Sequence, residues 1–108
     1  MTPEIDKPEG GPELDALIAE KVMEWTPQSY FLGPPFSTNI AAAWTVVEKL
    51  WAAGKDFDLE NFNQPGGGQG WRARFMRTTK NQDTVIAFAS TAPLAICRAA
   101  LKAVINCP

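Results

Sequence analysis

The stretch WRARFMRTTKNQDTVIAFASTAPLAICRAALKAV, residues 71–104, decides the fold of this 108-residue chain. Within residues 71–77 the apolar side chains of Trp71, Ala73 and Phe75 alternate with Arg72, Arg74 and Met76, which is typical of a strand with one buried face. Residues 84–89 are rich in β-branched and aromatic side chains and predict a second strand, after a polar turn at residues 78–83. Pro93 suits the first turn of a helix. The apolar stripe of this helix is expected to consist of Leu94, Cys97, Leu101, Val104 and Ile105.

Upstream of this stretch, Phe57 and Leu59 alternate with acidic residues and predict a further strand with one wet face. The segment QPGGGQG, residues 64–70, reads as a turn or a hairpin loop. A phosphate-binding glycine loop would instead lead into a helix N-terminus, and here a strand follows. Three successive strands joined by short turns imply an antiparallel meander.

Two helices are expected before the strands. The first runs from about residue 12 to 25 and ends at Thr26-Pro27, because the residue before a proline is pushed out of the α region. Ser37 or Thr38 is predicted to cap the second helix, and Gly54 to take the left-handed conformation that ends it. An apolar loop with a short edge strand at residues 30–32 is expected between them.

The apolar face of the second helix is its strongest feature. One stripe contains Ile40, Ala43, Trp44, Val47, Leu50 and Trp51. Trp44 and Trp51 are seven residues apart and therefore lie on the same side of the helix. We expect both tryptophans in the core.

These elements predict an α+β fold of order α-α-β-β-β-α. A three-stranded antiparallel meander sheet is packed by helices in an α/β/α sandwich-like arrangement. The length fits a single domain over residues 12–108, preceded by a flexible N-terminal arm at residues 1–11 that is rich in proline, glycine and charge. No apolar run could span a bilayer and no secretion signal is present, so a cytoplasmic protein is expected.

Three blocks of the sequence resemble a known family: LDALIAEKVMEWTP (14–27), FSTNIAAAWTVVEKL (36–50) and STAPLAICRAALKAV (90–104). In their residues and in their order along the chain, these blocks resemble the small phage and prophage proteins of the phage ABA sandwich domain family. The resemblance covers most of the chain except the N-terminal arm and residues 55–70. It implies a phage origin and a helix–sheet–helix sandwich, and it carries over no catalytic motif. With a phage origin, the expected cytoplasm is that of the host cell.

The chain departs from the family pattern at Glu24. Relatives tend to have a glycine before the tryptophan, where this sequence has Met23-Glu24-Trp25. This departure weakens the case for a special turn at Trp25.

Charge is distributed unevenly along the chain. Residues 1–69 hold eleven acidic and four basic side chains, a net of −7, while residues 70–108 hold six basic and one acidic, a net of +5. Arg98 and Lys102 are four residues apart and share the outer face of the last helix. If that face lies near the strand arginines, the basic side chains form a surface that suits phosphate or an acidic partner. The candidate binding surface consists of Arg72, Arg74, Arg77, Lys80, Arg98 and Lys102.

Two interpretations of this surface remain open. The order α-β-β-β-α from residue 39 onward is also that of double-stranded-RNA-binding domains, an analogy of topology alone. An isoelectric point near 5.0 is wrong for a dedicated nucleic-acid binder. We therefore favour a solvated surface, or one whose charges pair with the acidic half of the molecule.

Other candidate sites carry weaker signals. Trp25 and Trp71 lie near element ends and are possible partner anchors, although a place in the core is favoured. The acidic residues of the first strand, Asp56, Asp58 and Glu60, are expected on an exposed face and not around a calcium ion. Cys97 and Cys107 are expected to be free thiols, because an intact helix holds them too far apart for a disulfide. No metal site or cofactor is expected.

The function expected from the residues is binding and not catalysis. The chain has no histidine, the side chain most often used for proton transfer near neutral pH. We expect a non-catalytic phage or prophage accessory protein that binds a host or phage component, with inhibition of bacterial antiviral defence as one hypothesis. Nucleic-acid or nucleotide binding and a structural role in the virion are the alternatives. A homodimer through the apolar loop at residues 30–36, or through an edge strand, is also open.

Overall fold

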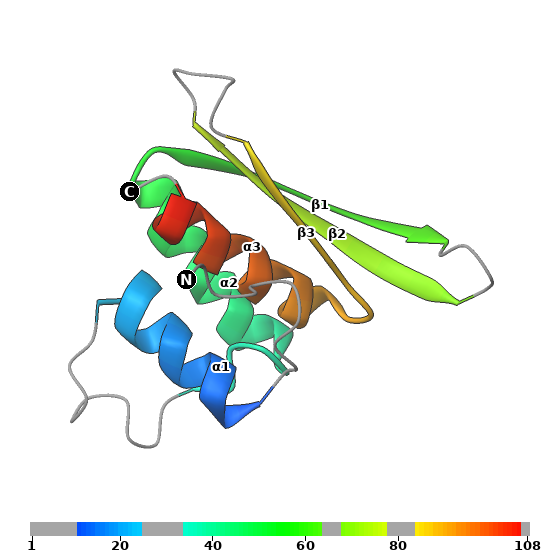
Figure 1. The fold of residues 1–108 in the computed structure, drawn as a ribbon, viewed down its shortest axis with the longest axis horizontal. Helices are drawn as coiled ribbons and strands as arrows, with labels where there is room; N and C mark the ends of the chain where they lie inside the picture. The colour runs from blue at the N-terminus through cyan, green and yellow to red at the C-terminus, as the bar shows by residue number, and fades with distance from the viewer. Residues whose placement is uncertain (1–10, 25–33, 64–67, 78–83, 107–108) are drawn as a thin grey trace.

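A computed structural model describes residues 11–24, 34–63, 68–77 and 84–106 (Figure 1). In this part of the chain three helices and three strands follow in the predicted order α-α-β-β-β-α, so the α+β fold class is confirmed. The elements are α1 (Pro12–Leu17), which continues into the π-helix η1 (Ile18–Val22), then α2 (Ile40–Ala52), β1 (Lys55–Asn63), β2 (Gln69–Arg77), β3 (Val85–Ala89) and α3 (Ala92–Asn106).

The sheet is the predicted antiparallel meander, with strand order β1-β2-β3. Phe57 pairs with Phe75 across β1 and β2, and Phe75 pairs in turn with Val85 of β3. Side chains of alternate residues therefore share a face across the three strands. The turn residues 64–67 and 78–83 lie outside the described part of the chain.

Odd-numbered residues of the strands form the inner face of the sheet. Ala73, Phe75 and Ala87 are almost completely buried. Helix α3 packs on β2 and β3, whereas α2 packs on α3 and on β1. The small side chains at Ala73 and Ala87 allow α3 to lie close to the sheet.

The layering differs from the predicted helix–sheet–helix sandwich. All three described helices lie on one side of the sheet, and α1 lies beyond α2 and α3, away from the strands (Figure 1). Both α2 and α3 contact η1, while the even-numbered residues of β2 that face the other way include Arg72 and Arg74. A face that carries charged side chains does not offer the apolar surface on which a helix could pack.

The first helix ends earlier than predicted. The Met23 N–H donates to the Ile18 carbonyl at 3.0 Å, which closes a wide π-type turn. Glu24 then has φ 61°, in the left-handed region that favours glycine. A left-handed residue thus precedes Trp25 although it is not a glycine, so the departure from the family pattern at Glu24 does not remove this conformation. Trp25 itself and the predicted edge strand at residues 30–32 lie outside the described residues, as does the arm at residues 1–10.

The N-cap of α2 also differs from the prediction. Asn39, not Ser37 or Thr38, accepts a hydrogen bond from the Ala42 N–H at 3.0 Å. Ser37 is buried instead, and its N–H and hydroxyl both donate to the Asp15 carboxylate, at 2.8 and 2.7 Å. This contact ties the first helix to the chain entering α2. At the other end of α2, Gly54 has φ 91°, as predicted.

The core lies between the sheet and the first helix. In α3, Leu94, Cys97 and Leu101 are buried, which confirms the predicted stripe, and Val104 and Ile105 pack against it. Burial raises the pKa of the Cys97 thiol well above its ordinary value, and the nearby negative charge of Asp15 raises it further. Cys97 is therefore a protonated core residue, while Cys107 lies beyond the described residues.

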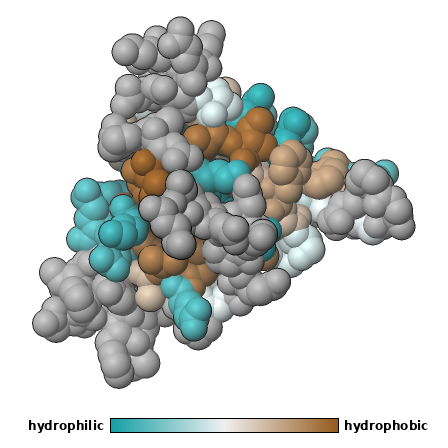
Figure 2. Space-filling view, viewed as in Figure 1, coloured by the Kyte–Doolittle hydropathy of each residue, from teal (hydrophilic) through white to brown (hydrophobic). Residues whose placement is uncertain are grey.

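Some large apolar side chains reach the surface. Figure 2 shows hydrophobic residues exposed between hydrophilic ones on the face that it presents. The exposed large apolar residues of the described ranges are Leu17, Ile40, Trp44, Trp51 and Phe88. Three of them, Ile40, Trp44 and Trp51, belong to α2.

Glu24→Gly is expected to raise the free energy of unfolding by about 1 kcal/mol, because glycine adopts the left-handed conformation without the steric cost that a Cβ imposes. Urea unfolding followed by circular dichroism measures the change. Glu24→Ala is the matched control: it also removes the exposed ion pair with Lys49, at 3.7 Å, but keeps the Cβ. Equal stabilities of the two variants would contradict this account of the turn.

Candidate functional site

Helix α2 has two apolar stripes instead of one. The buried stripe consists of Ala43, Val46, Val47 and Leu50. Trp44 and Trp51 lie about 90° around the helix from its centre, given 3.6 residues per turn. They are 46% and 68% exposed, so the prediction that both belong to the core is wrong. The spacing of seven correctly placed the two tryptophans on one side of the helix, but it could not tell which side faces the core.

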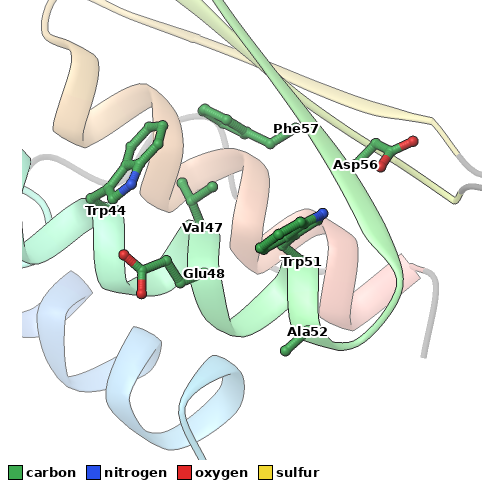
Figure 3. A pocket seen from close by; sticks show the side chains of 7 residues that line it. All are labelled: Trp44, Val47, Glu48, Trp51, Ala52, Asp56 and Phe57. Carbon is green, nitrogen blue, oxygen red and sulfur yellow. The ribbon is translucent and has the colours of Figure 1, made fainter.

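A groove separates this second stripe of α2 from strand β1 (Figure 3). Its volume is about 710 Å³, and it is lined by Trp44, Val47, Glu48, Trp51, Ala52, Asp56 and Phe57. Phe57 projects from β1 toward Trp44, whereas Asp56 points to the other side of the strand (Figure 3). The ring of Trp51 lies beside the beginning of β1 (Figure 3).

The aromatic side chains connect the groove to the core. The Trp44 and Phe57 rings meet edge to face, with centroids 5.8 Å apart and planes at 83°. Phe57 also contacts Phe75, whose ring centroid is 5.0 Å away and which is buried. Such pairs hold ring positions more firmly than burial alone. The wall at Trp44 is therefore held by neighbouring rings.

The groove also carries negative charge. Glu48 is exposed and lines it from α2, while Asp56 is exposed at its rim, with the side chain on the other side of β1. Within the described ranges neither carboxylate forms an ion pair. The nearby basic residues have interactions of their own: Lys49 pairs with Glu24, and Lys55 is also engaged. Aromatic faces and carboxylates both attract cationic groups.

Two residues of the predicted basic surface are paired within the sheet. Arg72 forms an ion pair with Glu60, and Arg74 with Asp58, each across the β1–β2 ladder. Asp58 and Glu60 thus lie on the solvent-facing side of β1 beside the exposed Asp56, as predicted. The structure therefore supports internal pairing for these two arginines.

Two more residues of the predicted basic surface are bound to the backbone of β3. Arg98 donates from Nη1 to the Phe88 carbonyl at 2.9 Å, and Lys102 donates from Nζ to the Ile86 carbonyl at 2.8 Å. The four residues from Arg98 to Lys102 rise about 6 Å along the helix, and two strand residues span nearly 7 Å, so the two spacings match. These side chains cover backbone acceptors at the free edge of β3.

The remaining predicted site residues are placed as follows. Arg77 ends β2, Lys80 and Trp25 lie outside the described residues, and Trp71 is partly buried against the core. In the strand register Arg72 is opposite Phe88 and Arg74 is opposite Ile86. Arg72 and Arg74 therefore lie on one side of β3, and Arg98 and Lys102 on the other. The apolar side chains of Ile86 and Phe88 lie between the two pairs.

An aromatic pair completes the outer face of the sheet. Phe62 of β1 and Phe88 of β3 meet edge to face, with centroids 5.4 Å apart, although β2 lies between their strands. Gly70 is the β2 partner of Phe62 and is buried. Its lack of a side chain leaves room for the two rings to meet across β2.

The described residues include no group of three or more His, Cys, Asp or Glu side chains that could hold a metal ion. Within the same ranges no helix is long and apolar enough to cross a membrane. Within the part of the chain that the structure describes, the groove between α2 and β1 is the candidate binding site. Sequence reasoning missed it, although the unusually wide apolar face of α2 could have indicated a second contact surface.

Comparison with protein families agrees with the resemblance in the sequence. The family described as the Phage ABA sandwich domain matches residues 16–101. The chain belongs to this family. The matched region of this phage ABA sandwich protein includes both walls of the groove and most of α3. Searches of curated proteins and of solved structures find no match.

Trp51→Ala is expected to change the free energy of unfolding by less than about 1 kcal/mol, since its side chain is mostly exposed. Leu50→Ala, one residue away in the buried stripe, is expected to cost about 2–5 kcal/mol. Thermal and urea unfolding of the two variants measure the difference. A loss at Trp51 as large as that at Leu50 would show that the tryptophan is a core residue after all.

Proposed function

We propose that this phage protein is a non-catalytic accessory protein that binds a protein partner through the groove between α2 and β1. The observation that carries the proposal is the exposure of Trp44 and Trp51 on the walls of one groove. Large aromatic side chains are the residues most often found to dominate the binding energy of protein interfaces. Burial of such side chains stabilises a folded domain, so the exposure of two of them side by side is typical of a binding surface.

A component of bacterial antiviral defence is the partner class to test first. Membership of a phage family supports a host component as the partner. A chain of this size can block such a component by occupying its surface, which requires only a complementary face. Exposed aromatic residues beside carboxylates provide such a face without catalytic groups.

Expression of the protein in bacteria that each carry one defence system is expected to raise the plating efficiency of a phage restricted by one of them. Trp51→Ala should lower affinity for the captured partner by about tenfold or more, as for a central aromatic hot spot. Quantitative pull-down and plating measure both effects.

Leu17→Ala is the control for this experiment, because it removes an exposed apolar side chain from α1, which does not line the groove. Unchanged plating across the panel, together with no Trp51-dependent partner, would contradict the proposal. Recovery of the protein in purified particles would instead support a structural role in the virion.

Nucleic-acid binding is the alternative, and the contacts of the basic residues argue against it. Arg72 and Arg74 are paired with carboxylates, and Arg98 and Lys102 donate to backbone carbonyls. A phosphate would have to displace these partners. We expect no gel shift with single- or double-stranded oligonucleotides even at low salt. A salt-dependent shift that is lost in Arg72→Ala and Arg98→Ala would reverse this conclusion.

A further inference from the structure

The two edges of the sheet differ. At the β3 edge, Arg98 and Lys102 occupy the outward carbonyls of Phe88 and Ile86. At the β1 edge, no described side chain donates to the backbone of residues 56–63. A long edge strand with unoccupied backbone groups is a template for pairing with another strand.

The sheet is too narrow for the helices that pack on it. Three strands about 4.8 Å apart cover about 14 Å, whereas two helices side by side need about 20 Å. Because α3 packs on β2 and β3, α2 packs mainly on β1 among the strands, and its tryptophan stripe faces the groove at that edge. One more strand beside β1 would widen the sheet to about the width of the two helices.

A strand added at β1 would have two distinct rows of side chains. Alternate side chains would enter the groove and contact Trp44, Trp51 and Phe57. The others would lie on the outer face of the sheet beside Asp56, Asp58 and Glu60 of β1. Of these acids, only Asp58 and Glu60 have ion-pair partners in the described ranges, both on β2.

We infer that the β1 edge binds an extended segment of the partner protein as a fourth strand, in which apolar and basic residues alternate. The apolar row occupies the groove, and the basic row lies beside Asp56, the one of these three acids without an ion pair in the described residues, where an opposite charge stabilises a cross-strand pair. A second copy of this chain fits poorly, since antiparallel pairing of two β1 strands would set acids against acids. This inference rests on the proposed function and specifies its partner.

A synthetic peptide tests the inference without knowledge of the partner. The probe is a capped peptide of about seven residues that alternates arginine and valine, a typical strand length. A matched peptide carries glutamate in place of arginine. Binding is followed by tryptophan fluorescence and by NMR shifts of the β1 amides. We expect the basic peptide to bind and the acidic peptide to bind at least about tenfold more weakly.

Backbone methylation distinguishes strand addition from other modes of binding. One peptide is N-methylated on every arginine and another on every valine. In a strand, alternate residues direct their N–H groups to opposite edges. One methylated peptide should therefore retain binding and the other should lose it. Equal binding of both would overturn strand addition.

Two substitutions test the named side chains, each with a matched control. Trp51→Ala and Asp56→Lys are each expected to weaken binding of the basic peptide by about tenfold. Leu17→Ala and Glu20→Lys make comparable changes at exposed positions of α1 and η1 and should leave binding unchanged. Equal weakening by the control variants would overturn the assignment of these residues.

The remaining outcomes are also decisive. No binding of the basic peptide, or its displacement by mononucleotides from the groove, would overturn the inference. A Trp51-dependent partner in the pull-down would still support the proposed function in that case. Peptide binding with no Trp51-dependent partner and no plating effect would support the binding mode while contradicting the biological role.

Discussion

The packing of α3 on the sheet is the constraint on which the rest of the structure depends. Ala73 and Ala87 on the strands meet a helix that is itself rich in alanine, so the backbones of helix and sheet lie close together. Helix α3 is buried along most of its length, because η1 and α2 pack on it in addition to the sheet.

The position of α3 explains the state of both sheet edges. Directly after β3 the chain turns back, so α3 runs antiparallel to that strand and its two cations reach the strand carbonyls. With α3 in this place, α2 packs mainly on β1 among the strands, and the second apolar stripe of α2 lies beside the β1 edge of the sheet. One edge is thus covered by side chains of its own domain, while the other stands beside an aromatic groove.

Charge has a structural role on the outer face of the sheet. The acids of β1 pair with the arginines of β2 across the ladder. These charged side chains are partly buried although no described helix covers this face, and each has a partner of opposite charge. Exposed pairs of this kind contribute little stability individually. Their effect is to specify strand register, because a shift by one residue would move the charged side chains into the core.

Local sequence determined the element order, the meander and the buried stripe of α3, because each depends on a repeat of two or of 3.6 residues and on turn residues beside it. It also placed Cys97 in the core and Gly54 at the end of α2. The neighbours of each face were decided only by the tertiary structure. Trp44 and Trp51 are exposed because a three-stranded sheet is narrower than two helices. The periodicity of α2 carries no information about the width of the sheet. In the same way, the partners of Arg98 and Lys102 are backbone carbonyls of another element, and only the packing of α3 brings them within reach.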